Sequence, residues 1–166
     1  MNIQKLTTKF EIRKLNESDI DAVYKIMQGN PMYFQYCPPM ATHQSILDDM
    51  KALPRGTAYE DKYYIGFYEG DSLVAVMDLI LNFPNKETAF IGFFMMNKAF
   101  QGKGLGTEII KECSMCLKED GYQYIRLGFA KGNPQSEAFW RKNGFERTGV
   151  EDVQERYTVV VLQKEL

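Results

Sequence analysis

The residues best suited to chemistry in this chain lie at Phe100–Ile110, which reads FQGKGLGTEII. Three glycines alternate with a lysine and a leucine, and the chain then becomes apolar. A helix N-terminus presents free backbone N–H groups and the positive end of the helix dipole, so it attracts anions. Glycines remove the Cβ atoms that would keep a phosphate away from the backbone. The stretch therefore predicts an anion-binding turn between a strand and a helix, with Lys103 adding positive charge and Thr107 a hydroxyl.

Two common phosphate-binding loops do not fit this stretch. A Walker loop has four residues between its glycines and then Lys-Ser/Thr, a pattern that is missing here. A dinucleotide fingerprint has the pattern GxGxxG and normally follows the first strand of a βαβ unit. Here Gly102, Gly104 and Gly106 spell GxGxG and follow the fourth expected strand. A glycine-rich turn without a ligand is the alternative that these residues leave open.

Hydrophobic periodicity and turn residues predict the elements that surround this turn. We expect strands at residues 10–15, 62–70, 73–81, 88–96 and 122–130, with a hairpin turn at Asp71-Ser72 and two more strands near the C-terminus. We expect helices at residues 19–27, 42–53, 105–120 and 133–142, and neither helix nor strand at 31–40. The order β-α-α-β-β-β-α-β-α-β-β predicts an α/β fold in a single domain, 1–166, with a mixed sheet of about seven strands and helices on both faces.

Composition restricts the class of partner. The chain has 166 residues, a net charge of −2 and a pI of about 5.5, which do not indicate a nucleic-acid-binding surface. Residues 1–15 lack the apolar segment of a secretory signal. No apolar run reaches the roughly 18 residues of a membrane span. We therefore expect a cytoplasmic protein that binds neither nucleic acid nor membrane.

The cysteines do not indicate a disulfide framework. There are three, Cys37, Cys113 and Cys116, and an odd count favours a reducing compartment. Cys113 and Cys116 spell CxxC, which also occurs in metal and redox sites. The chain has one histidine, His43, and no second cysteine pair to complete a zinc site. The surrounding run fits an amphipathic helix, so we expect both cysteines to be small core residues and the protein to hold no metal.

Two segments together carry a resemblance to a known family. Gln101–Gly106, QGKGLG, resembles the (Gln/Arg)-x-x-Gly-x-(Gly/Ala) loop of the GNAT superfamily of N-acetyltransferases. Asn133–Gly149, NPQSEAFWRKNGFERTG, is similar to a later segment of that superfamily, with an asparagine, an Ala-aromatic-aromatic helix and then Gly-Phe. The order of elements also matches, so the likeness covers nearly the whole chain.

The resemblance implies an acetyl-CoA site. The pyrophosphate would lie on the loop amides near Thr107, and the pantetheine arm would pair like an extra strand with Phe94–Met96. That strand and the strand at 122–130 would splay apart and leave a slot for the thioester. The cofactor-binding residues that the resemblance implies are Phe94, Met95, Met96, Gln101, Gly102, Lys103, Gly104, Leu105, Gly106, Thr107, Asn133, Ser136, Phe139, Trp140 and Lys142.

The sequence departs from the family at two catalytic positions. Trp140 stands where many members have a tyrosine that protonates the departing thiolate, and an indole N–H does not act as an acid. Phe93 stands where many members have a glutamate. Asp78 is a carboxylate among apolar residues of an expected central strand, so we predict it as the catalytic base. The alternative is an aspartate satisfied by backbone amides at a strand irregularity. The simpler interpretation of His43 is that it is a surface residue.

These observations predict an N-acetyltransferase that moves an acetyl group from acetyl-CoA to a primary amine of a small molecule or peptide. We expect direct attack in a ternary complex, because no cysteine or serine has the paired base of a covalent mechanism. The aromatic segment Tyr33–Tyr36 and the second expected helix would form the acceptor wall. A homodimer is left open. The alternative function is a non-catalytic CoA-binding sensor or interaction module with the same fold.

Overall fold

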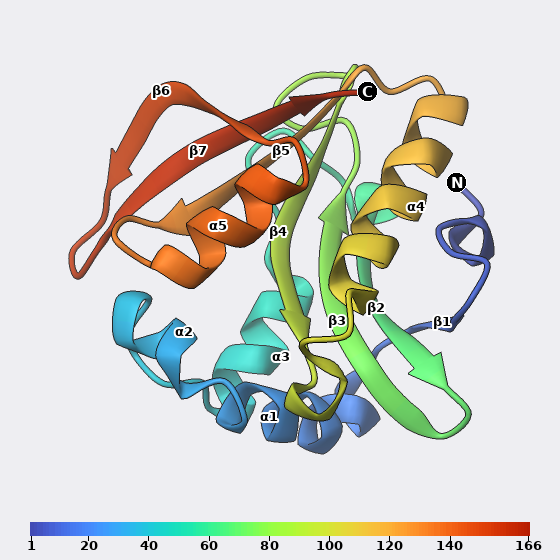
Figure 1. The fold of residues 1–166 in the computed structure, drawn as a ribbon, viewed down its shortest axis with the longest axis vertical. Helices are drawn as coiled ribbons and strands as arrows, with labels where there is room; N and C mark the ends of the chain where they lie inside the picture. Colours follow the sequence, from blue (N-terminus) through green and yellow to red (C-terminus); the bar gives the residue numbers. More distant parts are fainter.

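A computed structural model describes all residues, 1–166, as one seven-stranded sheet with helices on both faces (Figure 1). The strands are β1 (Glu11–Lys14), β2 (Lys62–Glu69), β3 (Ser72–Ile80), β4 (Thr88–Met96), β5 (Tyr124–Ala130), β6 (Glu146–Val153) and β7 (Thr158–Glu165). The α-helices are α1 (Ile20–Gln28), α2 (Pro31–Tyr36), α3 (His43–Lys51), α4 (Leu105–Glu119) and α5 (Pro134–Lys142). Short 3-10 turns lie at Ile3–Lys5, Glu17–Asp19, Tyr59–Asp61 and Lys98–Phe100.

The sheet opens between its two central strands. Its order is β1-β2-β3-β4-β5-β7-β6, and only β4 and β5 run parallel. Their pairing covers Thr88–Ile91 against Tyr124–Leu127, although both strands continue beyond it. On the β3 side, Asp78 faces Phe93 while Leu79 faces Ile91, so Gly92 is an extra residue. Such a bulge bends a strand, and here it lies where β4 leaves β5.

Two apolar clusters hold the helices against the sheet. The larger one packs α4 and Trp140 of α5 on one face, with Ile109 and Leu117 fully buried. The smaller one packs α1, α2 and α3 on the opposite face around Val23 and Ile46, both at 0% exposure. Burial on both faces fits the apolar character of β2 and β3, which the sequence shows as nearly continuous runs.

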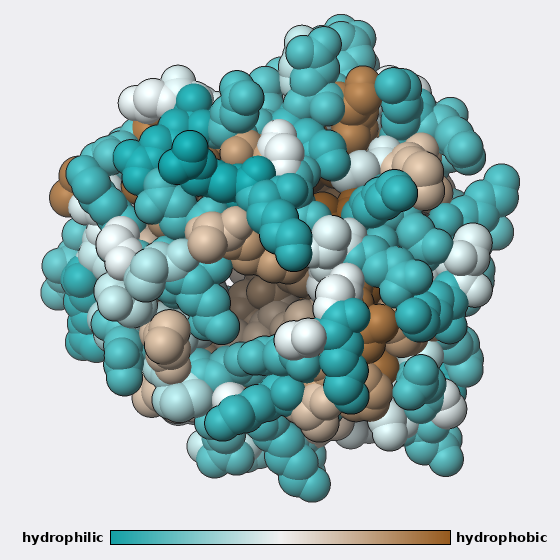
Figure 2. All heavy atoms as spheres, viewed as in Figure 1, coloured by the Kyte–Doolittle hydropathy of each residue, from teal (hydrophilic) through white to brown (hydrophobic).

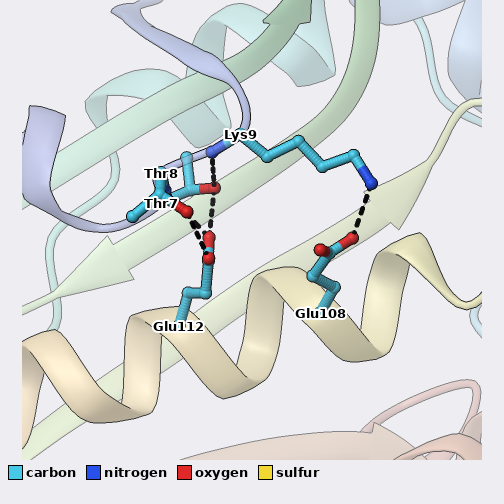
Figure 3. A network of polar contacts seen from close by, with 5 residues as sticks. All are labelled: Thr7, Thr8, Lys9, Glu108 and Glu112. Carbon is cyan, nitrogen blue, oxygen red and sulfur yellow. Dashed lines mark hydrogen bonds and ion pairs between the residues drawn. The ribbon is translucent and has the colours of Figure 1, made fainter.

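The N-terminal segment fixes the outer side of α4 (Figure 3). The Glu112 carboxylate accepts hydrogen bonds from the Thr8 backbone N–H at 2.9 Å, from the Thr8 hydroxyl at 2.6 Å and from the Thr7 hydroxyl. Lys9 pairs with Glu108 one turn earlier, at 2.9 Å. Burial acts to raise the pKa of Glu112, but the hydrogen bonds from the two threonines outweigh it and lower that pKa. This clamp sets the position of the helix that begins at the glycine-rich turn.

Most predicted elements are confirmed, and one segment was wrong. Residues 31–40 were expected to be irregular, but Pro31–Tyr36 forms α2. Pro31 occupies the first turn of this helix, where its missing N–H costs nothing, and the prolines after Cys37 end it. The connection between β1 and β2 thus contains three α-helices instead of two. The hairpin turn between β2 and β3 lies at Gly70-Asp71, one residue earlier than predicted.

The cysteine pair of α4 packs in the core as expected. Cys113 and Cys116 are 2% and 6% exposed and belong to the larger apolar cluster. Burial raises the pKa of both thiols, so they stay protonated. No three side chains of His, Cys, Asp or Glu come together in a group suited to a metal ion. None of the helices has the length and apolar character needed to span a membrane.

Candidate functional site

A cavity of about 400 Å³ lies where β4 separates from β5. Figure 2 shows a hollow near the centre of the face in view, with apolar side chains at its base. The lining comes from the turn between α1 and α2, from α2, β4, the glycine-rich turn, the first turn of α4, and α5. The lining residues are Asn30, Tyr33, Phe94, Met95, Met96, Phe100, Gln101, Gly102, Gly104, Leu105, Gly106, Thr107, Asn133, Gln135, Ser136, Phe139, Trp140 and Lys142.

The three glycines of the turn answer different requirements. Gly102 and Gly104 have φ of 75° and 78°, the left-handed region in which a Cβ costs roughly 1–2 kcal/mol. Gly106 has an ordinary helical backbone, but a Cβ there would lie 3.2 Å from the Phe139 ring and 3.4 Å from Met96 Cγ. The first two glycines therefore shape the turn. The third lets α4 approach β4 and α5 closely.

The start of α4 offers unpaired donors to the cavity. The first helical hydrogen bond runs from Glu108 N–H to Gly104 C=O at 3.0 Å, so the N–H groups of residues 105–107 have no acceptor within the helix. The helix dipole adds a partial positive charge at the same end. Lys142 lines the cavity from α5 and brings a full positive charge. The unpaired N–H groups and the positive charge both favour an anionic group at this end of the cavity.

The free edge of β4 provides a second set of backbone groups. Asn97 N–H donates to Val74 C=O at 2.8 Å on the β3 side. Because hydrogen-bonded and non-hydrogen-bonded pairs alternate in an antiparallel ladder, the N–H and C=O groups of Phe94 and Met96 point away from β3, toward the gap. An extended ligand with amide groups could pair with this edge as an added strand.

A side-chain network fixes the end of that edge. The Met96 carbonyl accepts hydrogen bonds from Asn30 Nδ2 at 3.0 Å and from Gln101 Nε2 at 3.1 Å. Gln101 Nε2 also donates to Asn30 Oδ1 at 2.7 Å. The network joins the turn between α1 and α2, the end of β4 and the start of the glycine-rich turn. Sequence analysis missed Asn30, because it lies after the first expected helix and outside both segments that carry the family resemblance.

α5 supplies an aromatic wall on the other side. Asn133 is 3% exposed and caps the helix by accepting a hydrogen bond from Ser136 N–H at 3.1 Å. Phe139 stacks on Phe94 with ring centroids 5.9 Å apart, and Trp140 contacts both rings. Trp140 is 7% exposed and also packs on Phe145. These rings make one wall of the cavity apolar.

The structure brings together all but one of the cofactor-binding residues expected from the resemblance. The exception is Lys103, which does not line the cavity: its ammonium donates to Ala99 C=O at 3.3 Å and lies 5.7 Å from the centre of the Phe100 ring. Sequence analysis missed Phe100 and Gln135 as well as Asn30. Phe100 comes directly before the loop segment, and Gln135 lies within Asn133–Gly149 at a position that is not one of the family's motif residues. Asn30 lies outside both segments.

Asp78 lies beside the bulge but does not line the cavity. Both of its carboxylate oxygens accept hydrogen bonds from Lys62 Nζ at 2.8 Å, and the two side chains are 11% and 4% exposed. A Cβ on Gly92 would lie 2.8 Å from Asp78 Oδ2, so the carboxylate sits directly over the bulge. Burial raises the pKa of Asp78, against the opposing effect of the Lys62 hydrogen bond and charge. The partner is therefore a buried lysine, which sequence analysis missed, and no backbone amide.

His43 lies away from the cavity. It begins α3, where its ring contacts Asp21 of α1 at 2.9 Å and packs on Tyr24 with ring centroids 4.4 Å apart. The side chain is 56% exposed. These contacts agree with the surface interpretation, in which His43 helps join α1 to α3.

Comparisons with known proteins bear on this site. A family model described as "Acetyltransferase (GNAT) family" matches residues 22–145. An acetyltransferase structure from Thermus thermophilus is 18% identical, with a TM-score of 0.75 over 96% of this chain and 99% of that one. The PaiA N-acetyltransferase of Thermoplasma acidophilum, solved in complex with coenzyme A, is 17% identical, with a TM-score of 0.68 over 95% and 99%.

A third solved structure is an acetyltransferase from Salmonella typhimurium that modifies the N-terminal serine of 50S ribosomal subunit protein L7/L12. It is 16% identical, with a TM-score of 0.72 over 97% of each chain. At such identities the likeness establishes the fold, and it leaves the acceptor open. No curated protein sequence matches the chain at a significant level.

Proposed function

Because the chain belongs to the GNAT family of acetyltransferases, we propose that it transfers an acetyl group from acetyl-CoA to a primary amine by direct attack in a ternary complex. One observation carries this proposal. The unpaired N–H groups of the first turn of α4 and the free edge of β4 open into the same cavity. That cavity lies at the point where the central strands separate.

The residues of the cavity suit the parts of acetyl-CoA in order. The pyrophosphate would accept hydrogen bonds from the backbone N–H groups of residues 102–107, with Lys142 as a nearby cation. The pantetheine amides would pair with Phe94 and Met96. The acetyl group would then lie near Gly92, where β4 leaves β5. Asn133, Ser136 and the aromatic wall of α5 would cover the other side.

The chemistry then needs a group that removes a proton from the amine. An aliphatic amine arrives as an ammonium and must become neutral before it attacks the thioester. We assign this role to Asp78, because it lies over the bulge and burial raises its pKa toward the range of a useful base. Lys62 would hold the carboxylate in place. Since Asp78 does not line the cavity, a water molecule would relay the proton.

Direct attack agrees with the placement of the cysteines. Cys113 and Cys116 are buried in the core, far from solvent. Cys37 is a free cysteine at the end of α2, and no hydrogen bond joins its thiol to a basic side chain. A covalent acetyl-enzyme would need an activated nucleophile, which none of these thiols provides. The departing thiolate, with an ordinary pKa of about 8.5, can take a proton from water.

The second candidate function is a CoA-binding sensor without turnover. Trp140 in place of the expected tyrosine favours it, because an indole donates a hydrogen bond but no proton at neutral pH. A screen of primary amines with acetyl-CoA, monitored by release of free thiol, separates the two functions. Amine-dependent thiol release supports the transferase. Tight acetyl-CoA binding with no release by any amine would overturn it in favour of the sensor.

A further inference from the structure

Tyr33 of α2 lines the cavity but has no part in the reaction as described above. It is the only tyrosine among the lining residues. Its ring packs against the smaller apolar cluster, whereas Trp140 of α5 belongs to the larger cluster on the opposite face of the sheet. In Figure 1, α2 lies below α5, and both helices contribute to the lining of the cavity. Tyr33 therefore reaches the cavity from the side that faces the aromatic wall of α5.

α2 follows the free edge of β4 toward the bulge. The Tyr33 N–H donates to the Asn30 C=O at 3.2 Å, and the Asn30 side chain donates to the Met96 carbonyl at 3.0 Å. One turn along, the Tyr33 ring meets the Phe93 ring edge-on, with centroids 5.7 Å apart. Met96 and Phe93 are three residues of strand apart, or about 10 Å. Asn30 thus marks the outer end of this edge, and Tyr33 marks the end beside Gly92, where β4 leaves β5.

The inner end of the edge is where the proposed function puts the sulfur of acetyl-CoA. The pantetheine amides would pair with Phe94 and Met96. The part of the arm that follows these amides carries the thioester, and it would continue toward Gly92. The sulfur would then lie beside Tyr33.

Transfer of the acetyl group leaves negative charge on this sulfur. As the amine nitrogen forms its bond to the carbonyl carbon, the C–S bond breaks and its electron pair stays on sulfur. A thiolate among aromatic rings lacks the hydrogen bonds that water would give it. A fixed donor directed at the sulfur therefore stabilises the transition state.

Other donors of the lining are held elsewhere. The side-chain amides of Asn30 and Gln101 both donate to the Met96 carbonyl, at 3.0 Å and 3.1 Å. Thr107 lies in the first turn of α4, at the end of the cavity that suits an anion. These groups serve the outer part of the site, so the inner end depends on Tyr33 and on the indole of Trp140.

The Tyr33 hydroxyl is available as a donor. Burial raises the pKa of Tyr33 well above its ordinary range, and the Cys37 thiol adds to this effect, so the hydroxyl stays protonated. A thiol is only a weak acceptor, and no hydrogen bond of ordinary geometry ties the hydroxyl to the rest of the protein. A thiolate would be a far stronger acceptor.

We propose that the Tyr33 hydroxyl donates a hydrogen bond to the sulfur of acetyl-CoA and stabilises the departing thiolate, which makes Tyr33 a catalytic residue. The inference rests on the proposed function. Tyr33 keeps its own proton, and the sulfur takes its proton from water after the C–S bond has broken. The missing acid at Trp140 is thereby replaced by a hydrogen-bond donor on a different helix.

The test compares CoA with desulfo-CoA, in which a hydrogen atom replaces the thiol group. Calorimetry gives both affinities at about pH 9.5, above the ordinary thiol pKa of about 8.5, so that CoA carries a thiolate. The preference for CoA over desulfo-CoA should be about 10- to 100-fold larger in the wild type than in Tyr33→Phe, the effect of one hydrogen bond to a charged group. The affinity for desulfo-CoA should be equal in the two proteins, because phenylalanine keeps the ring.

Tyr24→Phe is the matched control. It removes the same hydroxyl from a tyrosine of α1 that packs on His43, away from the cavity, and it should leave the preference for CoA unchanged. Equal preferences in the wild type and Tyr33→Phe would overturn the inference and leave the transferase proposal intact. A preference that falls in Trp140→Phe but not in Tyr33→Phe would assign the donor to the indole, which also overturns it.

Turnover gives a second measurement. With any primary amine that the thiol-release screen identifies, Tyr33→Phe should lower kcat by about 10- to 100-fold and keep the affinity for acetyl-CoA within a few-fold. Its melting temperature should stay near that of the wild type, since the ring still packs on Phe93. Full kcat in Tyr33→Phe would overturn the inference alone. A wild-type protein that binds neither CoA nor acetyl-CoA would overturn the proposed function as well, so the two failures are distinguishable.

Discussion

The two sides of the cavity are built from different parts of the chain. The cofactor side consists mainly of backbone groups: the first turn of α4 and the free edge of β4. The opposite side, where we expect the acceptor, consists of side chains: Tyr33 of α2, which lines the cavity, and the buried pair of Asp78 on β3 and Lys62 on β2. A backbone site depends on glycines at fixed spacing and tolerates changes elsewhere. A side-chain site can change its ligand by single substitutions, so the second side is where the choice of acceptor is expected to reside.

The largest effect should follow from placing a charge in the backbone site. Gly104→Asp introduces a carboxylate where we expect the pyrophosphate, at a residue with φ of 78°. We expect calorimetry to show a loss of acetyl-CoA affinity of about 100-fold or more. Gly121→Asp is the matched control, because Gly121 has φ of 95° and also has open space around its Cβ position, at the far end of α4. It should lose similar thermal stability and keep its affinity. Unchanged affinity in Gly104→Asp would contradict the cofactor assignment.

Removal of the proposed base should slow catalysis without weakening acetyl-CoA binding. Asp78→Asn should lower kcat by about two to four orders of magnitude, the usual effect of a positioned acid or base, and leave acetyl-CoA affinity near that of the wild type. It should also lower the melting temperature, because Lys62 keeps its buried charge without a counter-ion.

The double variant Lys62→Met/Asp78→Asn distinguishes a catalytic from a structural aspartate. It removes both charges of the buried pair and should recover thermal stability, but kcat should remain low. If Asp78→Asn alone lost stability and retained full kcat, Asp78 would be structural, and the base would have to be sought among water and the tyrosines of residues 59–68.

The network around Met96 should have a smaller effect, confined to the cofactor side. Gln101→Ala removes one hydrogen bond to the Met96 carbonyl and one to Asn30. Since a neutral hydrogen bond contributes about 1 kcal/mol, we expect acetyl-CoA affinity to fall by roughly five-fold. Gln135→Ala, also in the cavity lining, makes no such bonds and should change affinity less. An equal loss in both variants would show that the network does not hold the β4 edge.

The smallest effect should lie outside both sides, at the clamp on α4. Glu112→Gln should reduce the free energy of unfolding at neutral pH by about 1 kcal/mol, after allowance for solvent screening, with acetyl-CoA affinity unchanged. The pKa of Glu112 is lowered in the folded protein, so its contribution is present above the unfolded pKa of about 4.3 and is lost as the pH falls through the folded value. Urea unfolding at several pH values checks this. If the free energies of unfolding of wild type and Glu112→Gln still differed in acid, the prediction would be contradicted.

The difference between the two sides of the cavity also explains which features the sequence could predict. Gly102, Gly104 and Gly106 lie close together in the sequence at the start of α4, so their local spacing was enough to indicate an anion-binding N-terminus. β4 was predicted with its observed bounds, because the aromatic and apolar run has clear turn residues on both sides. Such patterns are local, so they can be recognised without knowledge of the tertiary structure.

The acceptor side could not be predicted in the same way. Lys62 begins a strand, and nothing local indicates that its ammonium is buried against Asp78. α2 was missed because prolines on both sides of Tyr33 suggested irregular chain, whereas Pro31 instead starts a helix.

Hydrogen–deuterium exchange tests most directly the claim that acetyl-CoA is held by backbone groups at the opening between β4 and β5. Exchange is measured with and without acetyl-CoA and followed in the peptides that cover residues 92–96 and 102–107. We predict slower exchange in both segments on addition of acetyl-CoA, with no change in β1, in β2 or around Glu112. Protection confined to other segments, or none in these two, would contradict the account.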